Sequence, residues 1–535
     1  MSGWRSSGAA ALVGVCLAGL VVVAASVGAG SGDTASHGDG LALATGVPSG
    51  PAKGFPGAGG GPRRGAGVGP AATDGSDDDT EQSSRPNVVV VLTDDQTDYD
   101  LRWMPLTRAA LGEDGMEFTD AISPHPLCCP ARAEMITGQY AQNNGVQHNN
   151  GPHGGYEALD PTQTIGQWFQ DAGYQTGFVG KYLNGYHAQA GRNPGWTLWD
   201  PLVQGIYDYF DFAFFNDGQG VATYDNYYVT NAVEERTNAA VRTFARDDRP
   251  FLLYSFHLAP HYRFDGHGNT EPPPVESSDR DAYADAVPPS LGKPSFNVAT
   301  QGSLPDFLRG RTRRTVQEVR ETFLARIRSL RAVDRSVESL VATLKETGEW
   351  DNTWLFFTSD NGYSMGEHRL VGKNVLTEES MQVPLLVHGP GVVPGSTSSL
   401  PVTLVDLPAT FADLAGVTPL RAVDGSSLAP ALAGQASPFR DTTLVQTGTS
   451  YGDGWAYRGV RTSRFTYAVR GAGDDVILYD RARDPYELVN RADDPAYAAI
   501  RTQLETRRQQ LVACASWTCN PAFGQLPEPA APAKP

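Results

Sequence analysis

Short, continuous apolar runs recur along the chain, and polar residues follow each of them at once. Residues 88–92 form the first run, and similar runs cover residues 175–179, 251–256 and 354–358. Such a run is typical of a strand that is buried on both faces of a sheet. Residues 316–344 instead carry apolar side chains at helical spacing. Strands that alternate with helices predict an α/β fold with a large, mostly parallel sheet between helices.

The pattern changes near residue 440. Short strand-like segments lie between residues 457 and 479, and a helical segment runs from residue 496 to about residue 512. Strands joined by such short connections predict antiparallel pairing. We therefore expect a large α/β domain over residues 86–440, of a size that could carry an active site. A smaller C-terminal antiparallel α+β subdomain should follow over residues 441–520.

The two ends of the chain lack these patterns. An apolar run rich in Ala, Gly and Val follows Arg5, and it predicts a signal peptide over residues 1–29 and hence secretion. An uncleaved N-terminal membrane anchor is the alternative. Residues 30–85 are rich in Gly, Pro, Ser and Asp and predict a disordered linker, because they cannot bury enough apolar surface to fold. The proline-rich residues 521–535 predict a disordered tail.

The amino-acid composition and net charge of the chain limit the kinds of molecule that it can bind. The chain has 535 residues and a formal net charge of −18. So acidic a protein is poorly suited to bind a nucleic-acid backbone, and we expect no nucleic-acid partner. Of the five cysteines, Cys514 and Cys519 lie close together near the C-terminus. In an exported protein such a pair predicts a disulfide.

Side chains that can bind a metal ion or take part in catalysis follow four of the predicted strands. In chain order they are Asp94 and Asp95, then Lys181, then His261, and then Asp360 and Asn361. Ligands bind beyond the carboxyl ends of parallel strands, so these side chains should converge on one cleft. The three carboxylates and the amide are hard oxygen donors, which suit Ca²⁺ or Mg²⁺ rather than zinc. Taken singly, each acidic motif fits a helix cap or a turn equally well. Together they predict a divalent cation site.

One stretch carries a more specific pattern. Residues 126–138 read Pro-Leu-Cys-Cys-Pro-Ala-Arg-Ala-Glu-Met-Ile-Thr-Gly and place Cys128, Pro130 and Arg132 at C-x-P-x-R spacing. This stretch resembles the signature of type I sulfatases, in which the first cysteine is oxidised after translation to formylglycine. The resemblance runs from Pro86 to about Cys519. Its Gly-Lys-Tyr-Leu-Asn form at Lys181 is similar to the subgroup of glucosamine-6-sulfatases and extracellular sulfatases.

The resemblance implies a fold, a set of residue roles and a reaction. The implied fold is alkaline-phosphatase-like. The implied metal ligands are Asp94, Asp95, Cys128, Asp360 and Asn361, and the implied catalytic residues are Cys128, Arg132, Lys181, His261 and Lys373. The implied reaction is hydrolysis of a sugar or aryl sulfate ester by a formylglycine gem-diol made from Cys128, with Ca²⁺ or Mg²⁺ as the cation. A sulfated small molecule or glycan is the expected substrate, and a formylglycine-generating enzyme is the expected maturation partner.

The chain also departs from the commonest form of the family. Leu183 stands where many members carry a histidine thought to deprotonate the gem-diol, which leaves His148 or His187 as candidate substitutes. Each of these two histidines fits a surface or structural role better than that of a base. The segment from Arg263 to about Arg309 is too long for an ordinary connection, and we interpret it as a substrate-shaping loop, with a disordered insert as the alternative.

Two other functions remain open at this point. A phosphonate or phosphate ester hydrolase of the same superfamily would use the same modified residue. A catalytically silent protein that binds sulfated glycans would keep Cys128 as a thiol.

Overall fold

The computed structural model describes residues 85–531, apart from 217–219, 266, 268, 299–304, 436–438, 450–453, 472 and 474. The predicted signal peptide, almost all of the predicted linker and the last four residues of the predicted tail lie outside the described residues. Among the described residues, no helix is long and apolar enough to cross a membrane.

A ten-stranded mixed sheet organises the larger part of the chain. Five neighbouring strands are parallel. In spatial order they are β11 (Thr353–Ser359), β1 (Asn87–Thr93), β8 (Phe251–Phe256), β4 (Gln175–Gly180) and β5 (Leu198–Gln204). Antiparallel strands flank them, namely β14 (Leu385–His388) and β2 (Met116–Phe118) on one side, and β6 (Phe212–Asn216) and β7 (Gly220–Tyr224) on the other. β15 (Ser396–Ser398) pairs with β2 in parallel. The predicted α/β fold class is confirmed.

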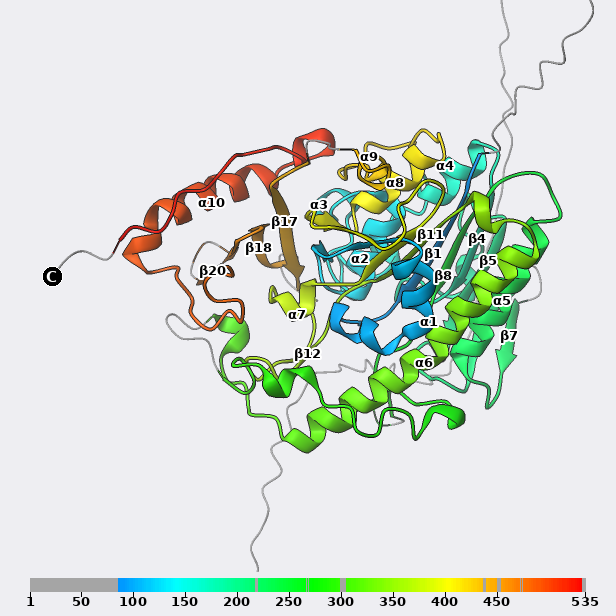
Figure 1. Cartoon of the computed structure of the whole chain (residues 1–535), viewed down its shortest axis with the longest axis horizontal. Coiled ribbons are helices and arrows are strands. Elements are labelled where there is room, and N and C mark those ends of the chain that lie inside the picture. The colour runs from blue at the N-terminus through cyan, green and yellow to red at the C-terminus, as the bar shows by residue number, and fades with distance from the viewer. Residues whose placement is uncertain are drawn as a thin grey trace, which may run out of the picture. The chain divides into compact units, whose positions relative to one another are not determined.

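Side chains of β1 alternate between two separate cores. Val88, Val90 and Leu92 face one core, whereas Val89 and Val91 face the other. The first core is covered by α2 (Cys128–Thr137), α4 (Ile165–Asp171) and α8 (Asp406–Leu414), and the second by α5 (Val229–Phe244) and α6 (Val316–Glu346). Figure 1 shows α5 and α6 running side by side along the sheet. A strand that is covered on both faces is apolar at every position, which explains the continuous apolar run.

α6 begins at its capping box. The Thr315 hydroxyl accepts a hydrogen bond from Glu318 N at 3.1 Å, and the Glu318 carboxylate accepts one from Thr315 N at 2.9 Å. This reciprocal pair satisfies two backbone donors at the start of the helix. The helix then runs to Glu346, two residues beyond the predicted end.

The C-terminal part of the chain forms the predicted smaller sheet. Its four antiparallel strands are β17 (Thr442–Gly448), β18 (Trp455–Thr462), β19 (Phe465–Arg470) and β20 (Asp475–Asp480). α10 (Ala498–Leu511) packs on one face, and side chains of the larger domain, including Ile122 and Met381, pack on the other. The sequence pattern did not single out β17, because threonine and glutamine interrupt its apolar residues although the whole strand is buried.

The long insert contacts the larger domain at several of its described residues. Lys293 Nζ lies 2.9 Å from Glu367 Oε1 and 3.0 Å from Glu379 Oε1. At an earlier point of the insert, Asp279 Oδ1 lies 2.9 Å from Arg331 Nε on α6. These ion pairs favour the loop interpretation over the disordered insert for the described residues.

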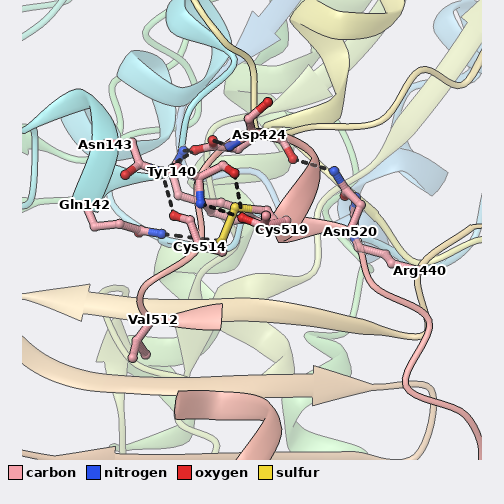
Figure 2. The surroundings of a disulfide bond; sticks show 12 residues. Tyr140, Gln142, Asn143, Asp424, Arg440, Val512, Cys514, Cys519 and Asn520 are labelled. Carbon is pink, nitrogen blue, oxygen red and sulfur yellow. Dashed lines mark hydrogen bonds between the residues drawn. A yellow bond between two sulfur atoms is a disulfide. The ribbon is translucent and has the colours of Figure 1, made fainter. Parts of the chain in front are cut away.

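Cys514 and Cys519 form the predicted disulfide. Figure 2 shows this short loop beside α3 (Ala141–Asn144) and Asp424. Asn143 Nδ2 donates to the Cys514 carbonyl at 3.0 Å, and Asp424 Oδ1 accepts from Ser516 N at 2.6 Å. The disulfide loop therefore connects the segment after α10 to the larger domain.

We expect the double variant Cys514→Ser/Cys519→Ser to lose about 2 kcal/mol of free energy of unfolding, because a short loop is no longer closed in the unfolded chain. Its catalytic constants should match the wild type, since the loop lies away from the catalytic groups described below. Denaturant unfolding of both proteins measures the loss. Wild type treated with a reductant is the matched control and should lose a similar amount. An unchanged midpoint in both would contradict a structural role for the bond.

Candidate active site

The polar residues predicted to converge do meet at one edge of the central sheet. Asp94 and Asp95 follow β1, Lys181 follows β4, His261 lies beyond β8, and Asp360 and Asn361 follow β11. All six are buried. The neighbouring strands run parallel, so their carboxyl ends lie together and the residues after them share one site.

Cys128 is the first residue of α2 and points into this group. Its thiol donates to Asp94 Oδ1 at 3.4 Å, while Lys373 Nζ lies 2.8 Å and Lys181 Nζ 3.6 Å from the sulfur. The side chain is fully buried. Burial raises the pKa of the Cys128 thiol to about 12 and the negative charge of Asp94 adds to the shift, although the two lysines oppose it. The thiol is therefore protonated at neutral pH and is a weak nucleophile.

Arg132 lies one turn further along α2 and joins two of the carboxylates. Its Nη2 is 3.0 Å from Asp94 Oδ2, and its Nε is 2.9 Å from Asp360 Oδ2. Burial by itself raises the pKa of Asp94, but the charges of Lys181, Arg132 and Lys373 outweigh that effect and hold the pKa well below its usual value. Asp94 is thus ionised, and Arg132 fixes its orientation.

Asp95 and Asn361 carry oxygen atoms without a partner. Asn361 Nδ2 donates to Asp95 Oδ1 at 2.8 Å, and Asp95 N donates to Asp360 Oδ1 at 3.1 Å. Asp95 Oδ2 and Asn361 Oδ1 are buried and have no hydrogen-bond partner among the described residues. An unsatisfied buried acceptor costs about 1–3 kcal/mol. A cation between these oxygens would remove that cost.

The donor set fits a divalent cation. Ligand atoms of Asp94, Asp95, Cys128 and His261 all lie within 4.8 Å of one another. The negative charges of Asp94, Asp95 and Asp360 equal in number the positive charges that pair with them. Those positive charges belong to Arg132, Lys181 and Lys373. A divalent ion would therefore leave the cluster with a net positive charge, which suits an anionic substrate.

His261 faces the cluster as a neutral imidazole. Its Nδ1 lies 2.6 Å from the Tyr262 carbonyl, and because a carbonyl oxygen only accepts, Nδ1 carries the proton. Nε2 then presents its lone pair 3.8 Å from Asp95 Oδ2. Burial, together with the charge of Lys181, lowers the pKa of His261 well below its usual value. The predicted catalytic histidine is thus placed in the cluster, where it could also serve as a metal ligand.

Neither candidate substitute for the missing histidine contacts Cys128 among the described residues. His187 is exposed. His148 is half-buried, and its Nδ1 accepts from Asn150 N at 3.3 Å. Within the part of the chain that the structure describes, the imidazole that reaches the cluster is His261.

Two supporting residues were missed by the sequence analysis. The guanidinium of Arg326 donates to the carbonyl oxygen of Asp95 and pairs with Asp100 at 3.3 Å. It thereby holds Asp95 in its left-handed conformation, with φ at 73°. The sequence did contain a sign that Arg326 has a buried role, because this charged residue interrupts the apolar stripe of α6. Asn149 Oδ1 accepts from Cys129 N at 2.8 Å, and nothing in the local sequence indicated it.

Cys129 has a structural role beside Cys128. Its thiol sulfur accepts a hydrogen bond from Asn184 N at 3.1 Å, and the side chain is fully buried. It thus connects α2 to the loop after β4.

A mostly parallel α/β sheet between helices, with buried charged residues at the carboxyl ends of its strands, is an alkaline-phosphatase-like architecture. Residues 86–417 match the sulfatase family, and residues 366–513 match the N-sulphoglucosamine sulphohydrolase C-terminal family. The chain belongs to the sulfatase family. The predicted family and the predicted sulfuric ester hydrolase activity are both confirmed.

Individual relatives agree with this assignment. The chain is 33% identical to human N-acetylglucosamine-6-sulfatase over 384 residues, which cover 68% of this chain and 67% of that protein. It is 31% identical over 383 residues to the extracellular sulfatase SULF-1 homologue of Drosophila melanogaster, covering 68% of this chain but only 33% of that protein. A protein solved with D-glucosamine-2-N,6-O-disulfate has a similar fold, with a TM-score of 0.66 at 21% identity over 79% of this chain and 97% of that chain.

Proposed function

We propose that this protein hydrolyses sulfate esters of sugars through a formylglycine made from Cys128, with a divalent cation held by Asp94, Asp95, Asp360, Asn361 and the modified residue. The observation that carries the proposal is the position of the Cys128 sulfur between two lysine ammonium groups, 2.8 and 3.6 Å away. Such a site binds an anion next to residue 128.

The surroundings of Cys128 support its conversion. A buried thiol with a pKa of about 12 would itself attack a sulfate ester poorly. Formylglycine, as the hydrated aldehyde, supplies one hydroxyl that attacks sulfur while the S–O bond to the alcohol breaks and the alcohol leaves. Deprotonation of the second hydroxyl then expels sulfate and restores the aldehyde. Because Cys128 is fully buried, a formylglycine-generating enzyme would have to act before the chain closes around it.

Hard oxygen donors favour Ca²⁺ as the cation, with Mg²⁺ as the alternative. The two unpartnered oxygens, Asp95 Oδ2 and Asn361 Oδ1, would complete their bonding on this ion. When bound, the ion would supply positive charge that stabilises negative oxygens and would make a nearby hydroxyl more acidic.

The protein's own side chains would divide the remaining work. Lys181 and Lys373 bind the sulfate oxygens, because their ammonium groups border the position of the Cys128 sulfur. Arg132 keeps Asp94 and Asp360 oriented. His261 presents an unprotonated Nε2 to the cluster and can accept a proton there.

Several observations support a sugar sulfate as the substrate and secretion of the protein. The human relative is named N-acetylglucosamine-6-sulfatase, and one structure of similar fold holds a sulfated glucosamine. These names favour a sugar sulfate over a phosphonate or phosphate ester. The Cys514–Cys519 disulfide and relatives named extracellular sulfatases support secretion.

Steady-state kinetics test the proposal. We expect the purified protein to hydrolyse N-acetylglucosamine 6-sulfate and 4-nitrophenyl sulfate, and to favour 4-nitrophenyl sulfate over 4-nitrophenyl phosphate and phenylphosphonate esters in kcat/KM by at least about 100-fold, equivalent to roughly 2.7 kcal/mol. A preference for the phosphorus esters would favour the other hydrolase. A Cys128 that remains a thiol in every copy, together with absence of all turnover, would favour the silent glycan-binding protein.

A further inference from the structure

Three aromatic side chains lie next to the cluster of buried charged residues around Cys128 and have no role in the proposed reaction. The Tyr207 ring lies 4.8 Å from the His261 ring, and Lys181 Nζ lies 4.6 Å from the Tyr207 centroid. The Tyr262 ring lies 4.0 Å from the His261 ring. Phe264 stands edge-on to both tyrosines, with centroids 5.2 Å from each. We call Tyr207, Tyr262 and Phe264 the aromatic wall.

The aromatic wall leads from the cluster to solvent. Tyr207 forms the inner end of the wall, because its ring lies against Lys181 and His261. Phe264 at the other end is 42% exposed, although it is a large apolar side chain. An exposed aromatic ring that lies beside a buried anion site is a candidate ligand contact, whereas a scattered one needs no explanation.

The wall is held in place by its neighbours. The Tyr207 hydroxyl donates to Asn184 Oδ1 at 2.9 Å. Phe264 lies on β9 (Arg263–Phe264), which pairs with β10 (Thr270–Glu271), and an ion pair of 2.7 Å joins Arg263 to Glu271. A ring that is already fixed loses little conformational entropy when a ligand packs on it.

A groove continues from the wall. A cavity of about 100 Å³ is lined by Tyr262, Thr270, Thr322 and Val371, among others. A second cavity of about 240 Å³ shares the last three of these residues and extends to Arg314. Val371 is 42% exposed and precedes Lys373 by two residues. The groove therefore meets the aromatic wall at Tyr262.

We propose that the aromatic wall binds the sugar ring of the alcohol part of the substrate, with Phe264 as a specificity-determining residue. This inference rests on the proposed function, because it assumes that the sulfate group is held by Lys181 and Lys373. Aromatic side chains offer a large, flat apolar surface, and the C–H face of a pyranose ring is the complementary surface. The wall thereby selects ring-bearing sulfate esters over inorganic sulfate and small alkyl sulfates.

Phe264→Ala and Phe264→Trp test this role. Trp517→Ala is the matched control, since Trp517 is an aromatic residue 81% exposed on the disulfide loop. The first readout is kcat/KM for N-acetylglucosamine 6-sulfate. Two inhibition constants then separate the parts of this substrate: N-acetylglucosamine represents the sugar ring, and inorganic sulfate represents the anion. Isothermal titration of N-acetylglucosamine gives the ring affinity independently of turnover.

For Phe264→Ala we expect kcat/KM to fall about tenfold, mainly through KM, with the inhibition constant of N-acetylglucosamine rising by a similar factor. Inhibition by inorganic sulfate should stay within about twofold of the wild type, because the anion does not contact the wall. Phe264→Trp should restore most of the ring affinity, and Trp517→Ala should match the wild type.

Unchanged sugar affinity in Phe264→Ala would overturn the inference, and so would an equal weakening of sugar and sulfate. These results differ from a failure of the proposed function. That failure would appear as a wild-type protein with formylglycine at position 128 that hydrolyses no sulfate ester, and titration of N-acetylglucosamine would still decide whether the wall binds a ring.

Discussion

Cys128→Ser is expected to bind sulfate esters but to lose multiple turnover, with kcat lower by at least about 10⁴-fold. A serine hydroxyl would lie in the same position, between Lys373 and Lys181, and could attack sulfur once. A single oxygen on Cβ offers no second hydroxyl for expelling sulfate, so the sulfated enzyme should persist. Steady-state kinetics measure the loss, and intact-protein mass spectrometry measures an adduct of one SO₃ group.

Cys129→Ser is the matched control for this experiment. It changes the adjacent cysteine, whose sulfur only accepts a hydrogen bond from Asn184 N. This variant should keep turnover within about tenfold of the wild type, with any loss arising from altered packing. Mass spectrometry of the wild-type peptide should show an aldehyde at residue 128 and a thiol at residue 129. Repeated turnover by Cys128→Ser would disprove the two-hydroxyl mechanism.

Asp95→Asn is expected to abolish binding of the divalent cation and to lower kcat/KM by at least about 100-fold, since a catalytic metal contributes several kcal/mol to the transition state. The amide keeps the shape of the carboxylate but removes its charge, which both the cation and Lys373 would use. Isothermal titration of chelator-treated protein with Ca²⁺ and with Mg²⁺ measures the binding and identifies the preferred ion.

Thermal unfolding gives a second readout of the same site. Because a ligand that binds only the folded state stabilises it, Ca²⁺ should raise the Tm of the wild type but not that of Asp95→Asn. Asp98→Asn is the control, because Asp98 lies three residues further along the chain and outside the cluster. If Asp95→Asn bound one equivalent of Ca²⁺ as tightly as the wild type, the assignment of Asp95 as a ligand would be wrong.

Much of the fold could be predicted because burial leaves a direct mark on composition. β1 is covered on both faces, so all five positions from Val88 to Leu92 had to be apolar, and the run was visible in the sequence. α6 was equally visible from its spacing. β17 was missed because backbone pairing with β18 and polar contacts, such as that of Thr443 Oγ1 with the Arg461 carbonyl, accommodate its buried polar residues.

The sequence by itself determined the residue types of the site and the strands that they follow. The C-x-P-x-R stretch, the acidic pair after β1 and the Asp-Asn pair after β11 are local patterns, and so is the short spacing of Cys514 and Cys519. The tertiary structure alone decided how distant loops meet. It placed Lys373 on the Cys128 sulfur, Arg326 behind Asp95 and Phe264 beside Tyr207. Such contacts join residues far apart in the chain, and their geometry depends on how the helices and loops pack around the sheet edge.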